Sequence, residues 1–69
     1  MNKYEIIIFW SDNDNCFIAE IPELKGCAAH GETHDDALKQ VKIVANEWMK
    51  IAKKEGWQIP KPKGRLIFA

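Results

Sequence analysis

The chain has 69 residues, of which 46% are hydrophobic, and its ten acidic residues balance its ten lysine and arginine residues. This length allows one small domain, and the hydrophobic content is too high for a disordered chain. No run of 18 apolar residues is present, which excludes a transmembrane helix, and two cysteines are too few for a disulfide framework. We therefore expect a single domain, residues 1–69, that lies in the cytoplasm.

The first two predicted strands form a hairpin. Residues 3–10 alternate their side chains between two faces, as a β-strand does. The polar residues 11–15 favour a turn, because such side chains bond to their own backbone. Residues 16–21 return as an antiparallel second strand, and Pro22 ends it because proline has no amide hydrogen to donate.

Small side chains dominate the third predicted strand, residues 26–31. Gly26 lets the chain re-enter the sheet at a backbone angle that other residues disfavour. Ala28 and Ala29 have so little bulk that we expect a helix to approach the sheet closely at these positions.

The clearest predicted element is a helix over residues 34–55. Thr33 is a good N-cap with Asp36 at the third helical position, and Gly56 is a good C-terminal cap. Apolar residues recur at spacings of three and four, so they form one stripe along the helix. The stripe consists of Ala37, Leu38, Val41, Val44, Ala45, Trp48, Ile51 and Ala52.

The helix is followed by a connector in which Pro60 and Pro62 prevent further helix. Residues 65–68 then predict a short final strand. The resulting order is β-β-β-α-β. It predicts an α+β fold with an antiparallel three-stranded sheet, one long helix and a short C-terminal strand.

Both faces of this sheet carry apolar side chains. The first strand places Ile7 and Phe9 on the face opposite Ile6, Ile8 and Trp10. One helix covers only one face, and leaving each such side chain in water forfeits about 1–3 kcal/mol. We therefore expect a homo-oligomer that uses the second face and the C-terminal edge strand. The expected oligomer interface consists of Ile7, Phe9, Leu66, Ile67 and Phe68.

The residue pattern contains no convincing catalytic or metal site. Asp12, Asp14 and Glu20 do not converge as the carboxylates of a two-metal nuclease must. Cys27 and His30 have metal-like spacing but supply too few ligands. We expect no enzyme activity, no catalytic residue, no metal and no cofactor, and we expect both cysteines to be small buried side chains.

Charge is divided unevenly along the chain. Residues 1–36 hold eight acids and two lysines, a formal charge of −6, whereas residues 37–69 hold two acids and eight bases, a formal charge of +6. Two interpretations fit the acidic half: it steers a basic partner, or it is a solvated face with no partner. The basic half surrounds Trp57 and is able to contact phosphates, but no base-reading module accompanies it.

Three ordered motifs connect this sequence with a known family. They are A-E-I-P-E-L-K-G-C at residues 19–27, A-H-G-E-T at residues 29–33 and G-W-Q-I-P-K-P at residues 56–62. Together they resemble the HicB family of bacterial antitoxins over most of the chain. The resemblance implies a partial RNase H-like fold and a partner, the small basic toxin HicA. That toxin has a double-stranded-RNA-binding-like fold and cleaves mRNA using a histidine.

The resemblance and the charge pattern together predict an antitoxin that occludes a HicA-type toxin, associates with itself and takes part in autoregulation of its operon. Many HicB proteins continue into a C-terminal DNA-binding domain. Because this sequence lacks one, we do not expect it to bind DNA directly. The alternatives are a stand-alone binding or scaffold domain without a toxin, and a degenerate RNase H-like nuclease. The residues expected to bind the toxin are Asp12, Asp14, Glu20, Glu23, Glu32 and Asp35.

Overall fold

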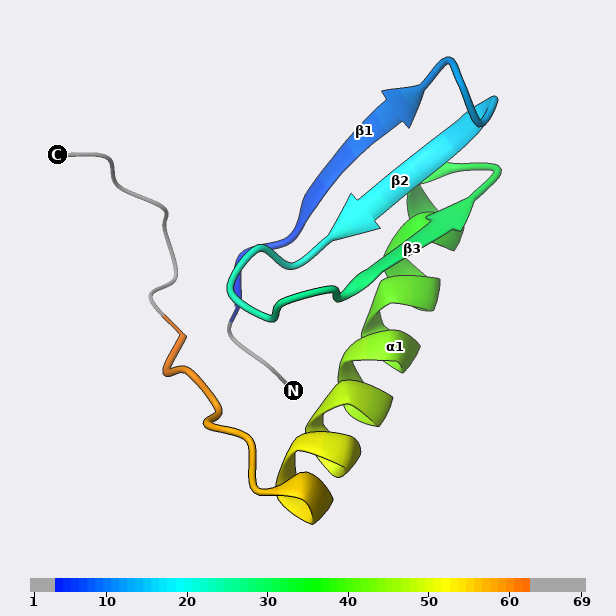
Figure 1. The fold of residues 1–69 in the computed structure, drawn as a ribbon. Helices are drawn as coiled ribbons and strands as arrows, with labels where there is room; N and C mark the ends of the chain where they lie inside the picture. Colours follow the sequence, from blue (N-terminus) through cyan, green and yellow to red (C-terminus); the bar gives the residue numbers. More distant parts are fainter. Residues whose placement is uncertain (1–3, 63–69) are drawn as a thin grey trace, which may run out of the picture.

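The computed structural model describes residues 4–62 and shows a sheet with a long helix packed on one of its faces (Figure 1). The elements, in chain order, are β1 (Ile7–Ser11), β2 (Cys16–Glu20), β3 (Ala28–Gly31) and α1 (His34–Glu55). The strands form one antiparallel sheet in the order β1-β2-β3. The predicted α+β fold is confirmed for this part of the chain, whereas the predicted strand at residues 65–68 lies outside it.

The three strands exist where we expected them, but they are shorter than the sequence pattern suggested. β1 begins at Ile7 because its pairing partner β2 ends at Glu20, directly opposite. Residues 4–6 therefore extend past the end of the ladder. β3 begins at Ala28 because Gly26, which has a φ of +79°, still belongs to the preceding turn.

Helix α1 has the bounds that its caps predict. The Thr33 hydroxyl accepts a hydrogen bond from the Asp36 amide at 3.0 Å, and Gly56 ends the helix with a φ of +75°. A further bond, from the Trp57 amide to the Ala52 carbonyl at 2.8 Å, closes the last turn. Among residues 4–62, no helix is long and apolar enough to cross a membrane.

The apolar stripe of α1 is buried along only part of its width. Four of its residues are fully buried, namely Ala37, Val41, Ala45 and Ala52. Ile51, which we expected in the same buried stripe, is instead 46% exposed. It lies two helical turns beyond the half-buried Val44, on the flank of the helix, where the sheet no longer covers it.

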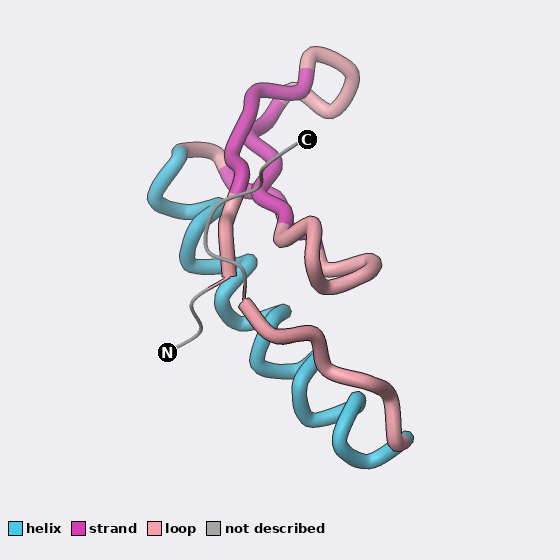
Figure 2. Tube along the Cα trace, turned by 90° about the vertical axis from the view of Figure 1, so that its left-hand side faces the viewer, coloured by secondary structure: helices cyan, strands magenta, loops and turns pink. Residues whose placement is uncertain are grey.

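The chain after α1 turns back and runs along the last turns of the helix (Figure 2). The Trp48 indole donates a hydrogen bond to the Lys25 carbonyl at 2.9 Å, and its ring lies 5.7 Å from that of Trp57. The Tyr4 hydroxyl donates a hydrogen bond to the Pro60 carbonyl. These contacts connect the β2–β3 loop to the helix, and they connect the tail to the helix and to Tyr4.

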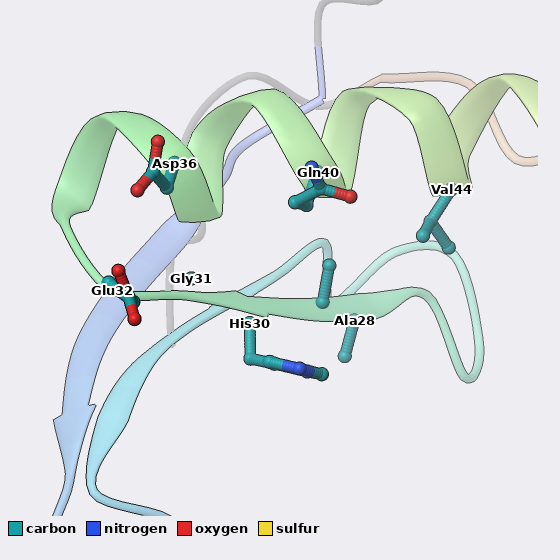
Figure 3. Close-up of a pocket in the computed structure, with 8 residues that line it drawn as sticks. Ala28, His30, Gly31, Glu32, Asp36, Gln40 and Val44 are labelled. Carbon is teal, nitrogen blue, oxygen red and sulfur yellow. The ribbon is translucent and has the colours of Figure 1, made fainter.

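The helix approaches the sheet very closely at Gly31, the last residue of β3 (Figure 3). A Cβ atom placed on Gly31 would lie 2.4 Å from the Ala37 amide nitrogen. Ala29 packs against the core, as we expected, but Ala28 is exposed because the alternation of the strand turns it to the opposite face. The packing therefore requires a small residue at Gly31, not at Ala28.

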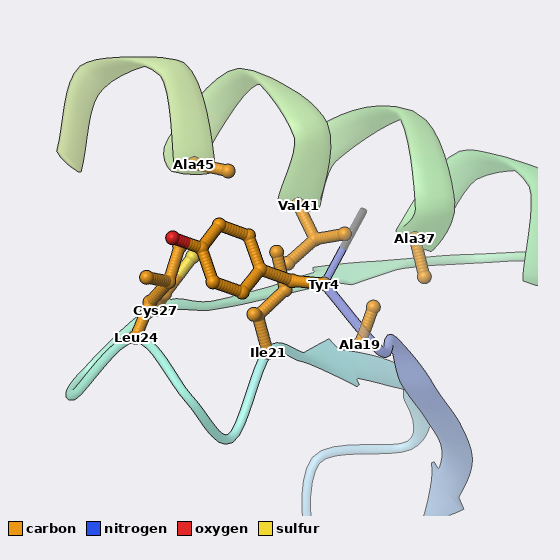
Figure 4. Packing of buried hydrophobic residues seen from close by; sticks show 8 residues of the cluster. All are labelled: Tyr4, Ala19, Ile21, Leu24, Cys27, Ala37, Val41 and Ala45. Carbon is orange, nitrogen blue, oxygen red and sulfur yellow. The ribbon is translucent and has the colours of Figure 1, made fainter. Parts of the chain in front are cut away.

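The core lies between α1 and the inner face of the sheet, and it includes the loop between β2 and β3 (Figure 4). Ile21, Leu24 and Cys27 each have at most 2% of their surface exposed. The Leu24 amide donates to the Ile21 carbonyl at 3.0 Å, and the Cys27 amide donates to the Leu24 carbonyl at 2.9 Å. These two successive turns direct the three side chains into the core, where Val41 and Ala45 meet them from the helix. Residues 21–27, which form most of the motif at residues 19–27, are therefore a loop that packs these three side chains in the core.

Candidate functional site

The sheet face that α1 does not cover is the candidate site, and we call it the outer face. Side chains alternate along each strand, and Ala19 and Ala29 occupy the inner face, where they pack in the core. Their neighbours along the strands therefore point away from the helix. The outer face consists of Ile7, Phe9, Ser11, Cys16, Ile18, Glu20, Ala28 and His30.

An apolar patch, made of Ile7, Phe9 and Ile18, occupies the middle of the outer face. Phe9 pairs with Ile18 across β1 and β2. Ile7 is 38% exposed and Phe9 is 42% exposed, although full burial of such side chains is worth about 1.5–3 kcal/mol each. Large apolar side chains grouped on one surface are typical of an interface. Of the residues expected at an oligomer interface, Ile7 and Phe9 lie here, and the other three lie outside the described residues, namely Leu66, Ile67 and Phe68.

Four of the six acidic residues that we expected to contact a partner lie at one end of the sheet. Because the strands are antiparallel, the β1–β2 turn and the junction between β3 and α1 lie at the same end (Figure 1). The turn carries Asp12 and Asp14, and the junction carries Glu32 and Asp35. All four residues are exposed, and we call them the acidic end.

The other two acidic residues, Glu20 and Glu23, lie at the opposite end of the sheet. Glu20 is on the outer face, directly across from Ile7, so it borders the apolar patch. Glu23 belongs to the β2–β3 loop near Tyr4. Burial raises the pKa of the Tyr4 hydroxyl, and the negative charge of Glu23 raises it further. The structure therefore does not gather all six acids on one surface.

Side-chain hydrogen bonds support the acidic β1–β2 turn. The Trp10 indole donates to the Asp12 carboxylate at 2.8 Å. The Ser11 hydroxyl donates to the Asp14 carboxylate at 3.0 Å, and it also accepts a bond from the Asp14 amide at 3.3 Å. A hollow of about 310 Å³ connects this turn with the apolar patch, and its lining is Asp14, Cys16, Ile18 and His30. Asp14 of the acidic end and Ile18 of the apolar patch therefore border the same hollow on the outer face.

A row of three aromatic rings supports the acidic end from the inner side of the sheet. The Trp10 and Phe17 rings meet edge to face at 5.1 Å, and the Phe17 ring lies 4.1 Å from the His34 ring. Sequence reasoning missed this row. Trp10 and Phe17 are direct cross-strand partners, so the hairpin register alone indicates their contact, but His34 joins them only through the path of the chain after β3.

The two cysteines have different surroundings. Cys27 is only 2% exposed, and burial raises the pKa of its thiol. Cys16 is half-buried on the outer face, so the expectation of a fully buried residue is wrong for Cys16. Both are free thiols. Within residues 4–62, no group of three or more His, Cys, Asp or Glu side chains is arranged to hold a metal ion.

The fold and the outer face together define a small α+β domain with an exposed apolar sheet face that is bordered by acidic residues. The chain belongs to the UPF0150-like family, whose model matches residues 2–60.

Curated relatives of the same family come from a bacterium and an archaeon. The chain is 36% identical over 58 residues to UPF0150 protein ssl0259 of Synechocystis sp., which is 84% of this chain and 78% of the relative. It is 32% identical over 65 residues to UPF0150 protein Ta0767 of Thermoplasma acidophilum, covering 94% of this chain and 93% of the relative. It is also 38% identical over 45 residues to UPF0150 protein ssr1258 of Synechocystis sp., covering 64% of this chain and 65% of the relative. No solved structure matches the chain.

Proposed function

We propose that this chain is a HicB-type antitoxin that binds a small, basic, mRNA-cleaving toxin of the HicA type and covers its active site. UPF0150 is a small HicB-like family, and the observed β-β-β-α order is the beginning of the β-β-β-α-β order that the HicB resemblance implies. The single observation that carries the proposal is the apolar patch, in which Ile7 and Phe9 are exposed and Ile18 is half-buried, beside Asp14 of the acidic end.

The two parts of this surface have different roles in the proposed complex. The acidic end attracts a basic toxin and orients its approach, an effect that salt weakens because exposed charges are screened. The apolar patch then excludes water from the contact and supplies most of the binding free energy. RNA is kept out because the antitoxin occupies the place where the substrate would bind, so the antitoxin itself performs no chemistry.

Non-enzymatic action is part of the proposal. Asp12 and Asp14 lie at one end of the sheet, while Glu20 and Glu23 lie at the other, so these carboxylates are not grouped as metal-dependent phosphoryl chemistry requires. Autoregulation of the operon would need the assembled complex. In that assembly, the basic last turn of α1 would supply phosphate contacts.

Co-expression with the product of a neighbouring reading frame that encodes a small basic protein tests the proposal. We expect that protein to arrest growth and the wild-type chain to relieve the arrest. Phe9→Asp should abolish the relief, because it places a charge in the apolar patch. Ile43→Asp is the matched control, since Ile43 is also exposed (55%) but lies on the helix. Arrest that the wild-type chain does not relieve, or relief that survives Phe9→Asp, would remove the proposed function.

A second candidate is a stand-alone binding domain whose outer face pairs with a second copy of the chain. The same exposed Ile7 and Phe9 side chains favour it. Sedimentation of the purified chain without any toxin distinguishes the two candidates. A dimer that Phe9→Asp converts to a monomer would support pairing through the outer face, whereas a state that Phe9→Asp leaves unchanged would leave this face available for the toxin.

A further inference from the structure

We propose that the basic toxin places one extended segment along the open edge of β3, as an added strand with a cationic side chain beside the start of α1. The inference rests on the proposed function, because it assigns the segment to the toxin. A groove of about 520 Å³ runs along this edge (Figure 3). Its floor is β3, and its wall is formed by Asp36, Gln40 and Val44 of the helix.

The open edge of β3 offers backbone hydrogen bonds to such a segment. Among residues 4–62, β3 pairs only with β2. The Ile21 amide donates to the Cys27 carbonyl at 3.0 Å, one residue pair beyond the end of the β2–β3 ladder. Because hydrogen-bonded and non-hydrogen-bonded pairs alternate in an antiparallel ladder, Ala28 and His30 direct their N–H and C=O groups away from β2. An added strand would bind these groups, as peptides do when they extend an exposed sheet edge.

The wall of the groove specifies the side chains that the added strand carries. Asp36, Gln40 and Val44 follow one another along the groove (Figure 3), and Glu32 lies at the Asp36 end. Residues four apart in a helix are separated by about 6 Å, and two residues of an antiparallel strand rise by about 6.8 Å. Alternate side chains of the strand therefore meet the three wall residues in turn. A lysine or arginine fits the acidic end of the groove, and an apolar side chain fits the Val44 end.

Charge and size select the basic toxin, not a second copy of this chain, as the occupant. The described residues that line the groove include two carboxylates and no lysine or arginine, so the groove is complementary to a basic segment. The β3 strand of a second copy would bring only Ala29 and Gly31 to the helix side, which leaves the wall without contacts. The groove also adjoins the proposed toxin site, because His30 lines both the groove and the hollow that Asp14 and Ile18 border.

Amide hydrogen exchange of the full chain tests the added strand. The probe is a synthetic peptide, Lys-Thr-Gln-Thr-Val with blocked ends, which carries the three inward side chains in antiparallel order. At about ten times its Kd, the peptide should slow exchange of the Ala28 and His30 amides about tenfold. The Ala29 and Gly31 amides should not change, because the same alternation directs them to β2. The control peptide has glutamate in place of lysine and should give no protection.

Two pairs of matched variants test the position of the contact, with circular dichroism as the check on folding. Asp36→Lys should weaken peptide binding about tenfold or more. Asp35→Lys makes the same charge change in the same helical turn and should weaken binding less, because Asp35 does not line the groove. Val44→Asp should also weaken binding, whereas Ile43→Asp should not, because Ile43 is exposed outside the groove.

Three results would overturn the proposal. The first is unchanged exchange of the Ala28 and His30 amides at millimolar peptide. The second is protection of these amides without peptide that rises with protein concentration, which would make a second copy the occupant. The third is protection without peptide at every concentration that deletion of residues 65–68 removes. In that case the tail of the chain itself would occupy the groove.

The co-expression assay separates failure of this inference from failure of the proposed function. Relief of growth arrest that survives Asp36→Lys and Val44→Asp but not Phe9→Asp would remove the added strand and leave the antitoxin. Peptide protection of β3 without any relief of arrest would remove the toxin as the occupant and leave a site for another basic strand.

Discussion

The sharpest stability prediction concerns Gly31, where the end of β3 passes under the first turn of α1. A Cβ atom on Gly31 would lie 2.4 Å from the Ala37 amide nitrogen and 2.7 Å from both the carbonyl carbon and the Cβ of Asp36. Two of these three atoms belong to the backbone, and the Ala37 amide makes a hydrogen bond to the Thr33 carbonyl at 3.0 Å. Gly31→Ala therefore forces the start of the helix away from the sheet.

The expected cost is large for a domain of this size. Overpacking a well-packed site costs about 1–3 kcal/mol, and a chain of this length is stable by only about 3–10 kcal/mol in total. A loss of about 2 kcal/mol lowers the melting temperature of such a domain by about 8–16 °C. Gly31→Ala should therefore fold but melt well below the wild-type chain.

Thermal unfolding and amide hydrogen exchange together test this reasoning. Gly26→Ala is the matched control, because Gly26 has a positive φ but open space around the added methyl group. That change strains the turn by about 1–2 kcal/mol without contacting the helix. Only Gly31→Ala should also speed the exchange of the Asp36 and Ala37 amides. Wild-type melting temperature and unchanged exchange in Gly31→Ala would refute the close-contact argument.

Three further predictions concern the helix cap, the core loop and the response to alkaline pH. Thr33→Ala should lower the free energy of unfolding by about 1 kcal/mol and Thr33→Ser by less; equal losses in urea titrations would contradict capping by the hydroxyl. Leu24→Ala should cost about 2–5 kcal/mol, because Leu24 is 1% exposed, and the test fails if the exposed Lys25→Ala costs as much. Burial raises the pKa of both Tyr4 and Cys27, so their neutral forms stabilise the fold. The free energy of unfolding should therefore be insensitive to these two groups below pH 9.0, the ordinary pKa of the thiol, and fall as pH rises past 9.0 and then past 10.0, the ordinary pKa of tyrosine. Tyr4→Phe should reduce the later part of this loss in urea titrations at constant ionic strength, and stability that increases over this range would have the wrong sign.

Local signals in the sequence were sufficient for the hairpin and the helix. Thr33 with Asp36 and Gly56 specify the two ends of α1, because caps act within one turn of the chain. Those ends agree with the structure. The alternating pattern of the first strand predicted that Ile7 and Phe9 share one face. The structure agrees, since both side chains are exposed on the sheet face away from the helix.

Strand ends were less predictable because they depend on the pairing partner. Residues 4–6 continue the alternating pattern, but β2 ends at Glu20 and leaves them without a ladder. The site was predictable only in part for a similar reason. Because β3 runs antiparallel to β2, the turn with Asp12 and Asp14 lies at the same end of the sheet as the start of α1. This arrangement brings Glu32 and Asp35 to that end, and it cannot be predicted from the residues next to each acid in the sequence.

The amino-acid sequence by itself determined where the helix begins and ends, which residues turn the chain, and which strand positions share a face. These properties follow from backbone chemistry and periodicity over a few residues. Only the tertiary structure decided that Gly31 must be small, that Ile51 and Cys16 are partly exposed, and that acidic and apolar residues share one surface. Those properties depend on which distant segments are brought into contact, and each contact is set by the packing of the whole domain.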